Sequence, residues 1–169
     1  SNAYYIQDEI QINDFIFTIG TRLDDNEKYG EELSPNLSVV YKLTENQRLK
    51  LSYAEGFKAP SLQEGSSEYS VYSHGQYYGN DDLQSETSRS YELGYEVYGQ
   101  DTLFKTAIFS TQLENMITGQ YIGDVYPYGP SMAISGYKYI NVAKANIKGF
   151  ETEIEYNLNE NHVLNVNYT

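Results

Sequence analysis

The chain has 169 residues, a formal net charge of −13 and no cysteine. Such acidity makes binding to a nucleic-acid backbone unfavourable, and the lack of cysteine excludes disulfides and thiolate metal ligands. Nineteen tyrosines stand beside no tryptophan, and tyrosine suits boundaries because its ring is apolar and its hydroxyl is polar. Residues 1–3, Ser-Asn-Ala, look like the remnant of a cleaved tag, so we expect the fold to occupy residues 4–169.

Apolar and polar residues alternate in segment after segment, and this period of two indicates β-strands. No segment has the pattern of a helix. In chain order, about eight strands are expected, at Tyr4–Ile12, Phe15–Leu23, Leu37–Leu43, Arg48–Tyr53, Tyr91–Val97, Thr102–Ile117, Lys148–Leu158 and Leu164–Tyr168.

The connections between these strands differ in length in a regular way. Those at Asn13–Asp14, Thr44–Gln47, Gly99–Asp101 and Asn159–Asn161 are short, whereas Asp24–Glu32 is of medium length and Phe57–Ser85 and Asn115–Ser135 are long. Because short and longer connections alternate along the chain, they predict an antiparallel up-and-down meander with tight turns at one end and large loops at the other. Transmembrane β-barrels have this form, and soluble sandwiches do not usually segregate their loops so regularly.

Each expected strand has one apolar and one polar face. In water the apolar face must be covered by a second layer, whereas in a wide barrel it meets lipid and the polar face lines the lumen. Glu151, Glu153 and Glu155 follow one another on a polar face, which would be costly in a packed core. No apolar run reaches the ~18 residues that a membrane helix needs, but barrel strands never show such a run.

Four segments in series resemble the TonB-dependent outer-membrane receptors. They are FTIGTRLDD at residues 17–25, PNLSVVYKLTENQRLKLSYAEGFKAPS at 35–61, NDDLQSETSRSYELGYE at 80–96 and YINVAKANIKGFETEIEY at 139–156. In the third segment, Asp81 and Ser85 stand where the family usually has proline. The resemblance is nearest to the colicin I receptor and the catecholate siderophore receptors.

This resemblance implies an all-β chain that forms part of a transmembrane barrel of ~22 strands in the outer membrane of a Gram-negative bacterium. The implied function is import of ferric siderophores or a similar scarce metal complex, with haem and cobalamin also open. The implied partners are that ligand, the TonB complex acting through a plug domain outside these residues, a colicin or phage, and the lipid bilayer with its lipopolysaccharide. No cofactor is implied. About a third of a barrel wall leaves two bare strand edges, so we expect the chain to self-associate.

Two tyrosine-rich loops are the candidate ligand-binding sites. Tyrosine among serine and glycine is typical of recognition loops, because the ring offers a large contact area with few rotatable bonds. An equally weighted alternative is a loop that packs on its own aromatic rings. The candidate residues are Tyr69, Tyr72, His74, Tyr77 and Tyr78 in the first loop and Tyr126 and Tyr128 in the second.

Three basic residues are candidates for the lumen or its mouth: Arg22, Lys50 and Lys58. In a siderophore receptor, cations there would draw an anionic ferric complex inward. For Arg22 and Lys50, we favour pairing with polar-face carboxylates such as Glu92 and Glu96.

The sequence offers no support for a metal site or for catalysis. His74 and His162 lie far apart, and the acidic segment Asp24–Glu32 lacks the ligand spacing of an EF-hand. There is no nucleophile-elbow or phosphate-loop motif, and the glutamates follow polar-face alternation rather than forming a glycosidase pair. We therefore expect a receptor and not an enzyme. Two alternatives stay open: a soluble all-β module that binds glycan or protein through its tyrosine-rich loops, and a passive porin-like channel.

Overall fold

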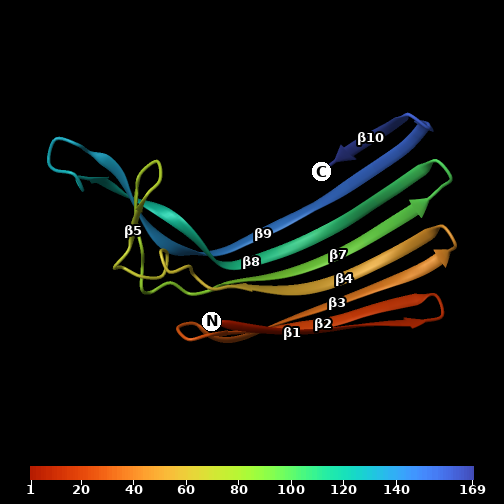
Figure 1. The fold of residues 1–169 in the computed structure, drawn as a ribbon, viewed down its shortest axis with the longest axis horizontal. Coiled ribbons are helices and arrows are strands. Elements are labelled where there is room, and N and C mark those ends of the chain that lie inside the picture. Colours follow the sequence, from red (N-terminus) through yellow and green to blue (C-terminus); the bar gives the residue numbers. More distant parts are fainter.

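A computed structural model describes all 169 residues, and it consists of strands, turns and loops. Eight long strands form a single curved sheet (Figure 1). These are β1 (Asn2–Ile12), β2 (Phe15–Asn26), β3 (Gly30–Thr44), β4 (Gln47–Lys58), β7 (Glu86–Tyr98), β8 (Thr102–Val125), β9 (Ile134–Asn159) and β10 (His162–Tyr168). Each of the eight expected strands is present, and the all-β class is confirmed.

Two short strands lie within the long connection between β4 and β7. They are β5 (Ser70–Tyr72) and β6 (Gln76–Tyr78), which pair with each other in antiparallel fashion. β6 also pairs with the outer part of β9, and this pairing is parallel, with Tyr77 opposite Tyr137. The sequence pattern did not predict either strand, because three residues are too few to show an alternation.

The long strands pair with their neighbours in the order β1-β2-β3-β4-β7-β8-β9-β10, and all these pairings are antiparallel. The predicted up-and-down meander is therefore confirmed. The sheet is open, since β1 pairs only with β2 and β10 only with β9. β1 includes Asn2 and Ala3, which pair with Asp25 and Asp24 although the sequence suggested that they belong to a tag remnant.

The turns after β1, β3, β7 and β9 lie at one end of the sheet, and the connections β2–β3, β4–β7 and β8–β9 lie at the other (Figure 1). The turn after β1 contains two residues, and Asn13 takes a φ of 52°, a left-handed conformation that asparagine tolerates. At the loop end, two expected lengths are wrong. β2 and β3 continue into the predicted acidic loop and leave only residues 27–29 between them, and β8 and β9 leave only residues 126–133.

One face of the sheet is apolar and bare. Leu51, Leu93, Ile108 and Phe150 are register partners in a row across β4, β7, β8 and β9, with exposed fractions of 57%, 40%, 58% and 48%. The one buried hydrophobic residue is Leu83, in the β4–β7 loop. No second layer packs on this face, so the soluble-module alternative, which requires one, is not supported.

The apolar face changes character towards the loop end. Tyr53 and Tyr91 are register partners whose ring centroids lie 5.1 Å apart. Two residues further along the same strands, Arg89 Nε lies 3.1 Å from Glu55 Oε1. Tyrosine followed by an ion pair fits the edge of a hydrocarbon layer, where aromatic girdles occur in membrane barrels. The structure contains no helix that is long and apolar enough to cross a membrane.

Candidate functional site

The polar face of the wall carries a row of alternating charges. Arg48, Glu96, Lys105 and Glu153 are successive register partners across β4, β7, β8 and β9. Lys105 Nζ lies 3.3 Å from Glu153 Oε2. Opposite charges on neighbouring strands stabilise the pairing of the sheet, and like charges in the same register would oppose it.

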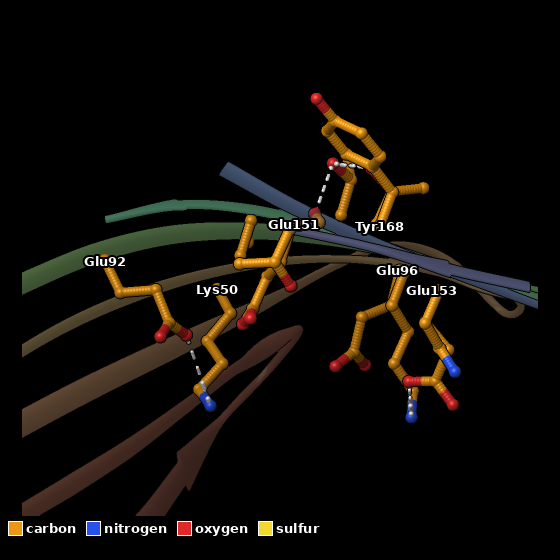
Figure 2. A pocket seen from close by; sticks show the side chains of 13 residues that line it. Lys50, Glu92, Glu96, Glu151, Glu153 and Tyr168 are labelled. Carbon is orange, nitrogen blue, oxygen red and sulfur yellow. Dashed lines mark hydrogen bonds and ion pairs between the residues drawn. The ribbon is translucent and has the colours of Figure 1, made fainter. Parts of the chain in front are cut away.

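A hollow of about 410 Å³ lies beside this row (Figure 2). In the next row of register partners, Gly94 and Ala107 lie between Lys50 and Glu151. Their side chains are small, so this part of the polar face is left open. Figure 2 shows the charged side chains on one side of the strands and the Tyr168 ring on the other. Two lysines and four glutamates line the hollow. The hollow therefore favours a positively charged group from whatever fills the space next to the wall.

The three candidate cations all have carboxylate partners. Lys50 Nζ lies 3.9 Å from Glu92 Oε1, which confirms the expected pairing. Lys58 Nζ lies 2.8 Å from Glu86 Oε2, at the loop end of β4 and β7.

For Arg22, the expected pairing with a polar-face carboxylate is confirmed, but its partner is neither Glu92 nor Glu96. Its Nη2 atom lies 2.8 Å from Oδ1 of Asp24, two residues along the same strand. The physical reason is distance across the sheet. β3 and β4 separate β2 from β7, so three strand spacings, about 14 Å, lie between Arg22 and those glutamates.

Glu86 joins three strands where the wall meets its loops. Besides its ion pair with Lys58 of β4, its Oε1 atom accepts a hydrogen bond of 2.6 Å from the backbone N–H of Ile117 in β8. Both contacts are charge-assisted, a class about twice as strong as neutral hydrogen bonds. Glu86 thus fixes the points from which the long loop leaves β4 and returns to β7.

The tyrosine-rich part of the first loop forms a finger, residues 64–81, which contains β5 and β6. Two of its candidate residues pack inward. The ring of Tyr77 stacks on Tyr137 of β9 at a centroid distance of 4.8 Å and meets Tyr139 at 5.5 Å. Tyr78 is half-buried. Tyr77 thus packs inward, but on tyrosines of β9 and not on rings of its own loop as the alternative expected.

The other loop candidates are exposed. Tyr69 and Tyr72 on the finger have exposed fractions of 42% and 60%, and Tyr126 and Tyr128 between β8 and β9 have 54% and 66%. His74, at the bend between β5 and β6, is also exposed and takes a φ of 52°. Because β6 pairs with β9, the finger and the β8–β9 hairpin form one assembly at the loop end. The exposed tyrosines of this assembly are Tyr69, Tyr72, Tyr126 and Tyr128.

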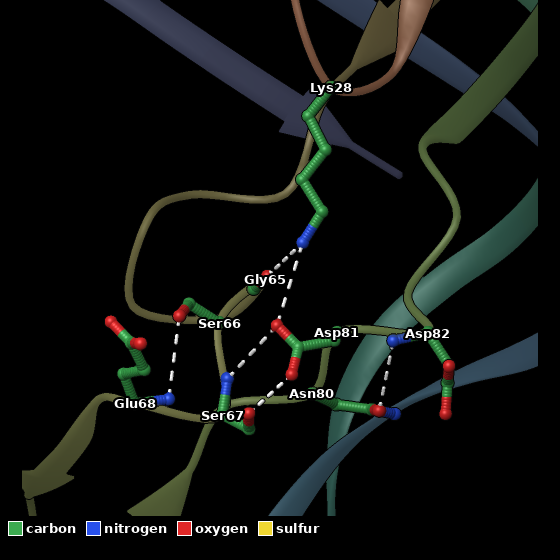
Figure 3. A network of polar contacts seen from close by, with 8 residues as sticks. All are labelled: Lys28, Gly65, Ser66, Ser67, Glu68, Asn80, Asp81 and Asp82. Carbon is green, nitrogen blue, oxygen red and sulfur yellow. Dashed lines mark hydrogen bonds and ion pairs between the residues drawn. The ribbon is translucent and has the colours of Figure 1, made fainter.

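The base of the finger contains a polar network (Figure 3). Lys28, from the β2–β3 loop, donates to the carbonyl of Gly65 at 2.5 Å and lies 3.7 Å from Asp81 Oδ1. Asp81 also accepts hydrogen bonds from the backbone N–H and the hydroxyl of Ser67. The Ser67 bonds first, and Lys28 to a smaller extent, hold the pKa of the Asp81 carboxyl below its ordinary value.

Several residues that organise this end of the molecule carried no signal in the sequence. Lys28 stood in a segment that read only as a solvated acidic loop. Asn141 Nδ2 donates to the backbone carbonyls of Gln84 and Asn115, and Asn80 Nδ2 donates to that of Tyr139. Polar residues in loops are common, and only the paths of the loops in space show which backbone groups they reach.

Known proteins resemble this chain along its whole length. The family model described as TonB dependent receptor-like, beta-barrel, matches residues 1–169. The ferrienterobactin receptor of Escherichia coli K12 is 29% identical over 94% of this chain. The iron-regulated outer membrane virulence protein of Vibrio cholerae O395 is 30% identical over 99% of it. The crystal structure of the siderophore receptor PirA from Pseudomonas aeruginosa superposes with a TM-score of 0.86, at 27% identity over 98% of this chain.

The chain spans only part of each of these relatives: 22% of the E. coli receptor, 26% of the V. cholerae protein and 32% of the PirA chain. This share agrees with an open sheet that forms one sector of a larger wall. The expected fold and the outer membrane as its place are thus confirmed. The chain belongs to the TonB-dependent receptor β-barrel family.

Proposed function

We propose that the whole protein imports ferric siderophores, and that a ferric tris-catecholate such as ferric enterobactin is the class it binds. Support comes from the relatives, which are named as receptors for enterobactin or other siderophores. The observation that carries the proposal is the match of the entire chain to the receptor barrel, with its long loops gathered at one end.

In this proposal, the loop end receives the ligand and the wall guides it. Tyr69, Tyr72, Tyr126 and Tyr128 offer exposed rings and hydroxyls, which suit an aromatic, oxygen-rich complex. His74, Tyr77 and Tyr78 would contribute at the edge of this surface. Arg22, Lys50 and Lys58 would add local positive charge, weakened by their carboxylate partners. The chain would bind and admit its ligand without catalysis, and a plug domain would receive energy from TonB.

Removal of exposed loop tyrosines tests this proposal. In the full-length receptor, Tyr72→Ala combined with Tyr128→Ala is expected to weaken ferric enterobactin affinity at least tenfold, since buried aromatic anchors each contribute roughly 1–2 kcal/mol to an interface. Titration of the purified receptor by fluorescence quenching measures the loss. Tyr98→Ala, at the turn end of β7, is the matched control. Equal affinity of the double variant and the wild type would exclude these rings as ligand contacts.

Other partners are proposed for the same surfaces. A colicin or phage would bind the exposed loops, and lipid with lipopolysaccharide would cover the apolar face. Deletion of residues 66–79 from the full-length receptor would then make cells resistant to such a colicin or phage. Sensitivity that persists after the deletion would place the contact elsewhere.

The isolated 169-residue chain is expected to self-associate in detergent. All residues of β1 and of β10 are exposed, and each strand leaves one edge unpaired. Unpaired backbone donors and acceptors on a strand edge bind other edges readily. Light scattering should therefore give a mass of at least two chains. A proline in place of Val166, in the middle of β10, should reduce this association, and a monomeric wild-type chain would contradict the prediction.

A further inference from the structure

The tyrosine-rich finger is closed at its base by contacts between its two stems. The backbone N–H of Asn80 donates to the carbonyl of Glu64 at 2.7 Å, and that of Gly79 donates to Tyr69 at 3.1 Å. Asp81 on the second stem accepts the two hydrogen bonds from Ser67 on the first. The finger is therefore an ordered unit whose tip depends on how its base is held.

Two neighbouring hairpins hold this base from opposite sides. On one side, Lys28 of the β2–β3 hairpin reaches both stems at once, through Gly65 on the first and Asp81 on the second (Figure 3). On the other side, β6 pairs with β9 and Asn80 donates to Tyr139. The long loop that carries the finger connects β4 to β7. The residues that anchor the finger belong to the β2–β3 hairpin on one side of these strands and to the β8–β9 hairpin on the other.

The Lys28 contact is more than an exposed ion pair. The side chains of Lys28 and Asp81 are 48% and 58% exposed, and an ion pair of that kind contributes little by itself. However, the ammonium also donates to the backbone of Gly65, which is buried, and this bond is charge-assisted. One cation therefore fixes the spacing of the two stems and ties them to another hairpin.

We infer that Lys28 and Asp81 are positioning residues for ligand binding, which hold the finger so that Tyr69 and Tyr72 are ordered before the ligand arrives. This inference rests on the proposed function, because it assigns a task to the loop that would contact the siderophore. A loop that is already ordered loses less conformational freedom on binding, so its affinity is higher than that of a mobile loop with the same side chains.

The test uses the full-length receptor with Lys28→Met, Asp81→Asn, Lys28→Arg and, as a matched control, Lys144→Met. Lys144 forms an exposed ion pair with Glu114 on β8 and β9 and does not contact the finger. Lys28→Met should accelerate hydrogen exchange at the amides of Gly79 and Asn80 and weaken ferric enterobactin affinity about fivefold. Asp81→Asn should act in the same direction. Lys28→Arg keeps the cation, so its hydrogen exchange and its affinity should stay near the wild-type values. Lys144→Met should change neither measurement.

The two measurements separate the ways in which the inference can fail. Unchanged hydrogen exchange in Lys28→Met would show that Lys28 does not hold the base. Faster exchange with unchanged affinity would show that the base is held but that this does not serve binding. A wild-type receptor that binds no ferric catecholate would overturn the proposed function and the positioning role together.

Discussion

Ile108→Arg is expected to destabilise the barrel by about 2–4 kcal/mol in a lipid bilayer, the cost of an arginine on the lipid face near the midplane. Ile108 lies between its register partners Leu93 and Phe150 in the bare apolar row, and its own exposed fraction is 58%. Arginine there would place a charged group among lipid chains, because the glutamates of the adjacent strands, such as Glu92 and Glu151, lie on the opposite face of the sheet. Denaturant titration of the full-length receptor in lipid vesicles measures the loss.

The neighbouring residue supplies the control. Ala107 belongs to the opposite face, where its register partners are Gly94 and Glu151, and it borders the hollow that carries more glutamates than lysines. Ala107→Arg would therefore find space and a carboxylate, and it should cost far less than Ile108→Arg. Equal destabilisation by the two arginines would mean that the assigned apolar face does not meet lipid.

The same lipid face explains which parts of the strands could be predicted from the sequence. Thr102–Ile117 was expected as a strand although both of its faces are apolar in places, and β8 continues beyond it to Val125. Alternation reports that one face lies in an apolar environment and the other in a polar one. After Ile117, β8 reads TGQYIGDV and mixes apolar and polar residues without regular alternation, while backbone pairing with β9 continues the strand.

The candidate site was predictable in composition but not in arrangement. An abundance of tyrosine marked both loops, but nothing in the chain distinguished Tyr72, which is exposed, from Tyr77, which stacks on Tyr137. That difference depends on the parallel pairing of β6 with β9, between segments about 60 residues apart. The bond from Lys28 to Gly65 likewise joins residues 37 positions apart. Local periodicity contains no information about such contacts.

Gly79→Ala is expected to open the finger and to weaken ferric enterobactin binding at least tenfold. A Cβ at this position would lie 1.9 Å from the carbonyl oxygen of Ser66 and 2.7 Å from that of Gln63. Both are backbone atoms, so relief requires the two stems to separate, at a typical overpacking cost of about 1–3 kcal/mol. The hydrogen bonds from Gly79 to Tyr69 and from Asn80 to Glu64 would break with them.

Gly94→Ala is the matched control, because a Cβ there would meet no atom closer than 3.7 Å. Hydrogen exchange at the amides of Ser67, Tyr69 and Asn80 should accelerate in Gly79→Ala alone, while the denaturant stability of the wall stays at the wild-type value in both variants. The effect on binding should exceed that of Lys28→Met, because the clash forces the stems apart, whereas loss of Lys28 only removes a tie between them. If Gly79→Ala retained full affinity with an opened base, the order of the finger could not be what presents Tyr69 and Tyr72 to the ligand.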